Sequence, residues 1–230
     1  MAALRVDPRF EAFYSISLAA HCLQVRPSTL SFWAFGRVSP MTGIRYQPLF
    51  KVADHKRRLL SFVNLIEAQV LRGLRSNHEL TLQNVRKALQ NLEPFRPDEP
   101  HPLAFIDFLT DNAGLFVEHL GDLIDLTRPE QYAIKATLID HLSRVERGSS
   151  EIKGPVRFFP LVPGALGERP VQVDPRFAFG RPVLTGTRIP TQEIAARVTA
   201  GEPPEEVAVD MGLKEEDVEK ALAFEGAQAA

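Results

Sequence analysis

The chain has 230 residues, 44% of them hydrophobic, enough for one large or two to three small packed domains. No run is long and apolar enough to span a bilayer, and the charged residues 1–13 lack the apolar stretch of a signal peptide. Because Cys22 is the single cysteine, an intramolecular disulfide is excluded. We therefore expect a cytoplasmic protein with no membrane association.

The formal charge of −2 hides an uneven distribution along the chain. Residues 1–75 hold 11 Lys and Arg against 4 Asp and Glu, whereas residues 170–230 hold 6 against 11. Attraction to DNA is dominated by phosphate contacts. The basic N-terminal third is therefore the segment best suited to bind DNA, the alternative being a merely solvated basic surface.

The stretch Tyr14–Gly36 is typical of two short helices joined by a tight turn. Ser17 is placed to cap the first helix, and Pro27 suits the first position of the second, where its missing N–H costs nothing. Leu30 and Trp33 are three residues apart, so they share one helical face and can close a core. Spacing alone leaves open an ordinary pair of core helices, but small residues at the crossing favour a helix-turn-helix.

This segment resembles the helix-turn-helix of MerR-like and excisionase-like DNA-binding proteins. The matching residues are Tyr14, Ser15, Ala19, Ala20, Val25, Ser28, Thr29, Leu30 and Trp33. Where MerR-like recognition helices usually carry Arg after the Leu, this chain has Ser31 and Phe32. The resemblance implies that the second helix enters the major groove. Although Phe32 departs from the family pattern, its apolar ring suits contact with a thymine methyl there. The predicted groove-facing residues are Arg26, Ser28, Thr29, Ser31 and Phe32.

A small β wing is predicted over Arg37–Phe50, where Pro and Gly alternate with apolar residues. Arg37, Arg45 and Lys51 would then lie beside the phosphate backbone. A longer helix is predicted over Lys56–Arg75, with an apolar stripe at 4-3-4 spacing. The stripe consists of Leu59, Val63, Ile66 and Val70. It fits either an intramolecular core face or the seam of a homodimer, in which two half-sites are read together.

After residue 80 the sequence predicts a mixture of short helices and short strands. A short helix capped by Thr81 is predicted over Leu80–Leu92, short β runs over Phe105–Leu126, and a helix over Gln131–Val145. Frequent Gly and Pro after residue 148 predict a linker. The predicted domains are 1–93, a helix-turn-helix DNA-binding domain with following helices; 94–147, a small α+β segment; 148–169, a Pro/Gly linker; and 170–226, a C-terminal helical module.

The pentapeptide Val-Asp-Pro-Arg-Phe occurs twice, at Val6–Phe10 and at Val173–Phe177. The residues that follow differ, so the pattern indicates a similar opening turn rather than a repeated domain.

Residues 170–226 closely resemble the domain-of-unknown-function family number 433. The resemblance rests on Asp174-Pro175, Gly180-Arg181-Pro182, Gly186-Thr187-Arg188-Ile189-Pro190, Gly201 and Leu213. It implies a small helical module often found in antitoxins beside PIN-type ribonuclease toxins. The residues themselves predict three helices: one capped by Thr191, one opened by Pro203-Pro204 and ended by Gly212, and one starting at Lys214.

The last of these helices is predicted to present four carboxylates outward, at Glu215, Glu216, Asp217 and Glu219. Because they repel phosphates, we expect a module of helix-turn-helix shape that does not bind DNA directly. A protein with a basic surface, such as the RNA groove of a ribonuclease, is the better partner, and a merely solvated acidic face is the alternative. The residues predicted to define the module or bind the partner are Arg181, Thr187 and Arg188, the two arginines through buried carboxylate pairs or through partner contact.

No catalytic or metal-binding pattern is present. The six histidines stand in no HExxH or CxxC-type arrangement, and no P-loop string occurs. We therefore expect no enzyme, no cofactor and no metal site.

Both ends resemble modules of the large VapB-type antitoxins of VapBC-like toxin–antitoxin systems. The resemblance implies a homodimeric antitoxin that binds operator double-stranded DNA of its own operon and neutralises a cognate toxin, a PIN-type ribonuclease. A stand-alone transcriptional regulator and a protein-interaction scaffold remain alternatives. The expected fold class is mainly α with a small β component (α+β): an N-terminal winged helix-turn-helix-like domain, a middle α+β segment and a C-terminal three-helix helix-turn-helix-like module.

Overall fold

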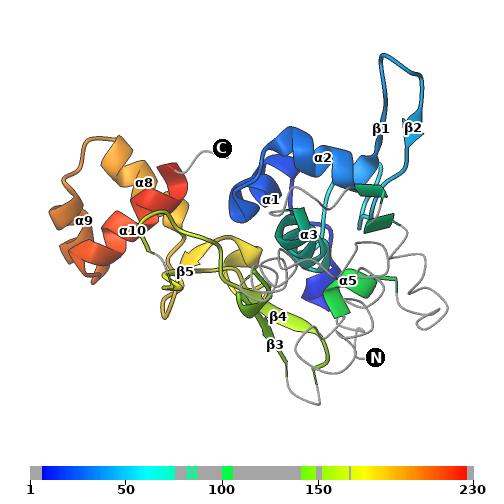
Figure 1. Ribbon diagram of the computed structural model, residues 1–230. Helices are drawn as coiled ribbons and strands as arrows, with labels where there is room; N and C mark the ends of the chain where they lie inside the picture. Colours follow the sequence, from blue (N-terminus) through cyan, green and yellow to red (C-terminus); the bar gives the residue numbers. More distant parts are fainter. Residues whose placement is uncertain are drawn as a thin grey trace, which may run out of the picture.

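The computed structural model describes residues 7–75, 82–83, 85–86, 100–105, 141–148, 152–165 and 167–226. Over these residues the protein is mainly α-helical with a small β component, as predicted. Within the same ranges, no helix combines the length and the apolar character needed to cross a membrane. Figure 1 shows helices α8–α10 grouped on one side and helices α1–α3 on the other, with short strands between them.

The predicted helix, turn and second helix are present as α1 (Ile16–Leu23) and α2 (Pro27–Phe35). Ser15 caps α1 in place of the predicted Ser17, because the helix begins at the residue between them. The Oγ of Ser15 accepts a hydrogen bond from the N–H of Leu18 at 3.1 Å. The proline expected to open α2 does so.

The two helices close over a shared core. Ala19 and Ala20 of α1 are buried, and so are Leu30 and Trp33 of α2. Gln24 ends α1 in the left-handed conformation, which turns the chain sharply toward α2. The small residues therefore allow the close crossing that the sequence indicated.

A two-stranded antiparallel hairpin follows α2 and confirms the predicted wing. It consists of β1 (Arg37–Val38) and β2 (Arg45–Tyr46). Gly36 lies in the left-handed region with φ +70°, and a Cβ there would lie 2.1 Å from the carbonyl oxygen of Tyr46. Glycine is therefore required where the chain leaves α2. In Figure 1 the hairpin projects away from the helices.

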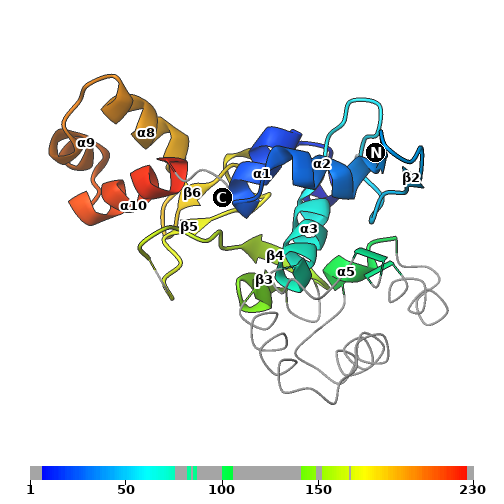
Figure 2. The same ribbon diagram turned by 45° about the horizontal axis from the view of Figure 1, so that its top comes forward.

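Helix α3 (Phe62–Arg75) is central to the N-terminal half and begins later than predicted. The preceding residues are held by backbone pairing instead: Asp54 bridges Leu59, and the N–H of Tyr14 donates to the carbonyl of Leu60 at 2.9 Å. Almost every residue of α3 is buried, and Figure 2 shows the helix surrounded by other segments. The predicted stripe therefore serves the intramolecular core.

The middle segment and the expected linker together differ from the prediction in three places. Phe105 ends a short helix, α5 (Pro102–Phe105), rather than starting a strand. Val145 begins strand β3 (Val145–Arg147) rather than ending a helix. The expected linker contains β4 (Pro155–Phe158), which pairs antiparallel with β3. The remaining predictions here, namely β runs over 106–126, helix over 131–140 and the Thr81 cap, lie outside the described residues.

Strand β4 ties the middle segment to the C-terminal module. Phe158 is fully buried, and its backbone exchanges hydrogen bonds of 3.0 and 2.8 Å with Val173. Beside them, β5 (Val171–Gln172) pairs antiparallel with β6 (Val183–Leu184). A Pro/Gly-rich stretch thus becomes ordered because its hydrogen-bonding partners come from segments on both sides of it in sequence.

The C-terminal module has the three predicted helices, α8 (Thr191–Thr199), α9 (Pro204–Met211) and α10 (Glu215–Gly226). Thr191 is not the cap of α8, since Pro190 holds that position; its buried hydroxyl bonds instead to a carboxylate of α10. The module has its own apolar core, formed by Leu184, Ile194, Val207, Ala208, Val218 and Ala221.

The repeated pentapeptide forms the same turn twice. The backbone N–H and Nε of Arg9 donate to Oδ1 of Asp7 at 3.0 Å, and those of Arg176 donate to Oδ1 of Asp174 at 2.9 Å. In both copies the phenylalanine N–H donates to the aspartate carbonyl at 3.0 Å. The copies differ in burial, because Asp7 is 40% exposed and Asp174 is fully buried.

Candidate nucleic-acid and partner interfaces

The predicted DNA-reading residues lie along the outer side of α2. Arg26 and Ser28, at its N-terminal end, are exposed, and Thr29 is half-buried. Ser31 and Phe32, one turn further on, are also half-buried. All five therefore reach the surface, but the two residues at the middle of the helix are partly covered by neighbouring side chains.

The wing covers one side of α2. The ring of Phe32 meets the ring of Tyr46 edge-on, with centroids 5.9 Å apart. The guanidinium of Arg37 lies 4.6 Å from the centroid of the Phe32 ring. Phe32 therefore anchors the hairpin against α2, a packing role that adds to its predicted contact with a base.

Another arginine covers a neighbouring part of the surface of α2. Nη2 of Arg58 donates to Oγ of Ser31 at 2.9 Å, and its guanidinium lies 3.9 Å from the centroid of the Phe35 ring. Arg58 belongs to the exposed run Lys56-Arg57-Arg58, which the sequence analysis assigned to a helix. This run of cations is visible in the sequence, and the structure places its last member, Arg58, against α2.

A groove of about 810 Å³ lies between α2, the wing and the end of α3. Phe32, Arg37 and Arg45, three of the predicted contacts, line it together with Arg75 and Arg86. Nothing in the sequence pattern pointed to these last two arginines. Lys51 is exposed but does not line the groove, and neither do the predicted residues at the N-terminal end of α2.

The surface formed by α2 and the wing, the basic face, carries positive charge. From residue 12 to residue 53 the chain contains no Asp or Glu, while it contains Arg26, Arg37, Arg45 and Lys51. Low carboxylate content around exposed cations gives a positive potential that attracts a polyanion.

Arg181 and Arg188 do not form the predicted carboxylate pairs; other arginines pair with the carboxylate of the C-terminal module. Arg181 and Arg188 are exposed, and no carboxylate of the described residues lies within salt-bridge distance of either. The guanidinium of Arg188 instead lies 5.1 Å from the ring centroid of Phe177. The hydroxyl of Thr187 is used within its own loop, donating to the carbonyl of Leu184 at 2.9 Å.

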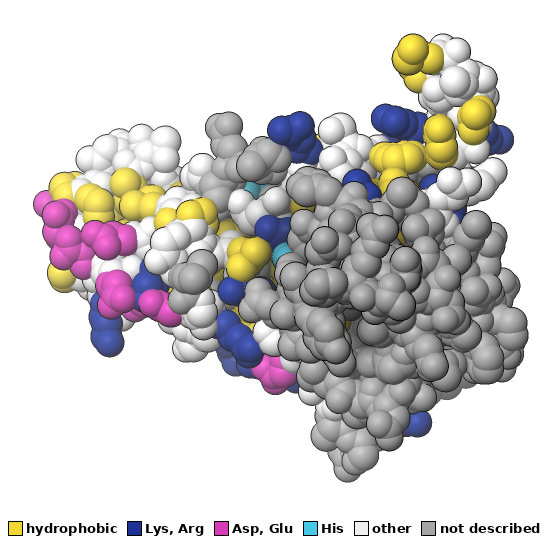
Figure 3. All heavy atoms as spheres, viewed as in Figure 1, with side chains coloured by type: hydrophobic (Ala, Val, Ile, Leu, Met, Phe, Trp, Pro, Cys, Tyr) yellow, Lys and Arg dark blue, Asp and Glu magenta, His cyan; other side chains and the backbone are white. Residues whose placement is uncertain are grey.

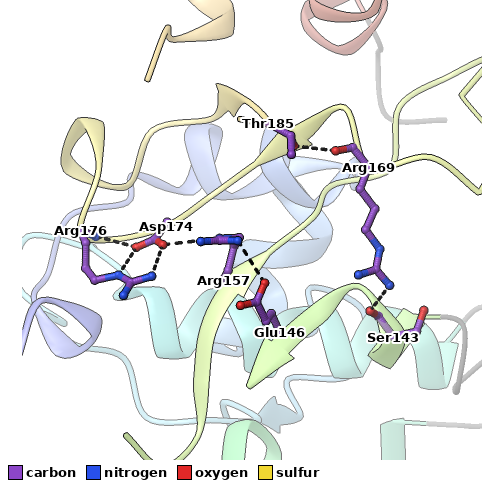
Figure 4. A network of polar contacts seen from close by, with 7 residues as sticks. All are labelled: Ser143, Glu146, Arg157, Arg169, Asp174, Arg176 and Thr185. Carbon is purple, nitrogen blue, oxygen red and sulfur yellow. Dashed lines mark hydrogen bonds and ion pairs between the residues drawn. The ribbon is translucent and has the colours of Figure 1, made fainter. Parts of the chain in front are cut away.

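The buried carboxylate of the module is Asp174. Nη2 of Arg176 lies 2.6 Å from its Oδ2, and Nε of Arg157 approaches the same oxygen at 3.6 Å. Figure 4 shows the two guanidinium groups on either side of Asp174, with Arg157 also reaching Glu146. A carboxylate with no access to water needs such partners. Asp174 is one of the residues that match the family, but its cationic partners are Arg157 and Arg176 and not the predicted Arg181 and Arg188.

Helices α9 and α10 carry the acidic face. Their exposed carboxylates are Glu205, Glu206, Asp210, Glu215, Glu216 and Glu219. Figure 3 shows acidic side chains gathered over these helices, with Lys and Arg side chains spread over the rest of this view. Val209 lies among them and is largely exposed. The face therefore combines an apolar side chain with surrounding negative charge.

Side chains of α1 and of Tyr14, just before it, contact the C-terminal module. The hydroxyl of buried Tyr14 donates to the carbonyl of Gly180 at 2.9 Å, and Nε2 of His21 lies 3.2 Å from a carboxylate oxygen of Glu225. Burial alone would raise the pKa of Glu225, but the close contact with His21 and the hydrogen bond from Thr191 hold that pKa below its usual value. The module is thus docked directly on α1.

Known proteins resemble both the module and the whole chain. The family described as a protein of unknown function, DUF433, matches residues 171–224. A Mycobacterium tuberculosis (strain ATCC 25618 / H37Rv) protein named as a candidate antitoxin, VapB45, is 27% identical over 236 residues, covering 94% of this chain and 95% of that protein. The crystal structure of Rv2018 from Mycobacterium tuberculosis superposes with a TM-score of 0.68 at 22% identity, over 95% of this chain and 100% of that one. This last likeness shows a shared fold.

Proposed function

We propose that this chain is the antitoxin of a type II, VapBC-like toxin–antitoxin system. It would bind and neutralise a PIN-type ribonuclease and repress its own operon by binding operator DNA, acting as a cytoplasmic homodimer without enzymatic activity of its own. The observation that carries the proposal is the similarity to VapB45, which extends over nearly the full length of both chains. The separation of a basic face from an acidic face supports it, because the two partners differ in charge.

In this proposal the basic face holds DNA. Arg26, Ser28, Thr29, Ser31 and Phe32 would face the major groove, while Arg37, Arg45 and Lys51 would meet phosphates. Two copies of α2 in a homodimer would read two half-sites. Because the stripe of α3 is buried within one chain, the dimer would use another surface.

The acidic face of α9 and α10 would cover the toxin's RNA-binding groove. A ribonuclease binds a polyanion, so its RNA-binding groove must be basic. Complementary charge between that groove and the acidic face would speed the encounter and fix the orientation of the two proteins. Val209 would supply an apolar contact among the carboxylates. The exposed Arg181 and Arg188, near Thr187, are the predicted partner contacts at the base of the module.

The first test is co-expression of the tagged chain with the product of the neighbouring gene, followed by a ribonuclease assay. We expect a stable complex in which RNA cleavage is suppressed. The variant Glu206→Lys plus Glu219→Lys should weaken the complex about tenfold or more at low salt, or about 1.4 kcal/mol. The control variant Glu11→Lys plus Glu193→Lys carries the same charge change outside this face and should retain the complex. Absence of any complex would overturn the antitoxin proposal and favour a stand-alone regulator.

The DNA arm is tested by the salt dependence of binding to the region upstream of the gene. Each phosphate contact contributes about 0.9 to the slope of log affinity against log salt, so Arg37→Ala plus Lys51→Ala should reduce the slope by about 2. Lys214→Ala removes an exposed cation from the C-terminal module and should leave the slope unchanged. An unchanged slope in the double variant would refute the assignment of these two residues.

A further inference from the structure

The tip of the β1–β2 hairpin carries apolar side chains that nothing covers among the described residues. Met41 is 93% exposed, Val38 57% and Ile44 53%. Figure 3 shows hydrophobic side chains at the end of this projection, with Lys and Arg side chains close to its base. Exposed apolar side chains gathered at a protruding tip are typical of an interaction site.

The tip is held in one shape by its own hydrogen bonds. The N–H of Ser39 donates to the carbonyl of Ile44 at 2.8 Å, and the N–H of Gly43 donates to the carbonyl of Ser39 at 2.9 Å. Pro40 fixes its own φ angle, and Gly43 takes the left-handed conformation with φ +68°. Met41 is therefore presented on a preorganised turn, which lowers the entropy lost on binding.

Charge favours DNA as the occupant of this surface. Arg37 and Arg45 stand at the base of the hairpin, and no carboxylate occurs in the chain from residue 12 to residue 53. Pairing of the tip with a second copy of itself would bring these like charges together, which is unfavourable. DNA offers both partners, because its phosphates can pair with the arginines and its stacked bases provide an apolar surface for the tip.

The dimensions of the hairpin fit the minor groove. Met41 stands five positions after Gly36, which at about 3.3 Å per extended residue gives a reach of at most about 16 Å. With α2 in the major groove, the adjacent minor groove lies about half a helical turn away, or about 17 Å. Arg37, which packs on Phe32 of α2, fixes the direction in which the hairpin leaves the helix.

We propose that this hairpin is a minor-groove arm whose tip inserts the side chain of Met41 between two stacked base pairs and bends the DNA. The inference rests on the proposed DNA binding and adds to it a second reading element. Apolar wedges of this kind kink a duplex by about 20–90°. Pyrimidine–purine steps unstack most easily, so the site should carry a TA or CA/TG step where the tip lands.

The test uses the full chain and the upstream segment that it protects in footprinting. Bending is measured by circular permutation of that segment, and unstacking by the fluorescence of 2-aminopurine placed at the candidate step. Wild type should bend the segment and raise the fluorescence severalfold. Met41→Ser should lose most of both effects and bind several-fold more weakly with an unchanged salt slope, because no charge is removed. Phe179→Ser, a change to the same residue at an exposed apolar side chain outside both proposed binding faces, should behave as wild type.

The outcomes separate this inference from the proposed function. Duplex binding by wild type without bending or fluorescence change overturns the wedge alone, and so does a Met41→Ser variant that bends DNA like wild type. No duplex binding by wild type overturns both. If Met41→Ser instead halves the particle mass measured by light scattering, the tip is an interface between copies and the wedge is wrong.

Discussion

Burial decides how much each copy of the repeated turn contributes to stability, and the two aspartates test this within one protein. Asp174 and Asp7 each accept hydrogen bonds from the backbone N–H, the Nε and the Nη2 of the arginine two residues on. The bonds match to within 0.1 Å, but Asp174 is fully buried whereas Asp7 is 40% exposed. Replacing each by alanine therefore removes the same local contacts from different surroundings.

The expected magnitudes differ severalfold. Asp174→Ala breaks a buried ion pair and leaves Arg157 with only its partly exposed contact to Glu146; breaking a buried pair typically costs about 3–5 kcal/mol. Asp7→Ala breaks a partly exposed pair, worth at most about 1 kcal/mol. At about 2–4 °C per kcal/mol for a chain of this size, the melting temperature should fall by roughly 10 °C for Asp174→Ala and by no more than about 4 °C for Asp7→Ala.

The assay is thermal unfolding followed by circular dichroism, repeated in urea to obtain free energies of unfolding. Asp174→Asn retains one acceptor oxygen and should lie between wild type and Asp174→Ala. Equal losses for the two alanine variants would refute the reasoning, because local hydrogen bonds and not burial would then set the stability of the turn.

Three further predictions follow from the junction between α1 and the module. Burial raises the pKa of the Cys22 thiol well above its usual value, so thiol reagents should label it at pH 8 only after unfolding, and rapid labelling of the native protein would contradict this. Because the pKa of Glu225 is lowered in the folded protein, its carboxylate stabilises the fold above about pH 4.5, and this contribution is lost as the pH falls through the folded pKa. The free energy of unfolding of wild type should therefore exceed that of Glu225→Gln by less below pH 4.5 than above it. A difference that stays constant with pH would contradict this prediction. Tyr14→Phe leaves the buried carbonyl of Gly180 without its donor and should cost about 1–3 kcal/mol in urea unfolding, whereas an unchanged midpoint would show that the bond contributes nothing.

Local signals in the sequence predicted the helical framework well. Pro27 and Gly36 limit α2, and Gly212 ends α9 in the left-handed conformation, because caps and turns depend on residues within a few positions of one another. The repeated pentapeptide likewise gives the same turn at both sites, since its hydrogen bonds span only three residues. The caps at Ser17 and Thr191 were each misplaced, the first by two residues and the second by one.

The sequence by itself therefore determined the order of α1–α3 and of α8–α10, the wing after α2, the resemblance of the C-terminal module to a known family, and the division of charge between the two ends. Only the tertiary structure decided which arginines neutralise Asp174, that Arg58 lies beside α2, and that Phe158 belongs to a strand rather than a linker. Each of these depends on contacts between segments distant in sequence, and no local propensity encodes them. The same Asp-Pro-Arg-Phe turn is buried in one place and partly exposed in the other for this reason: its shape is local, but its burial is set by what packs against it.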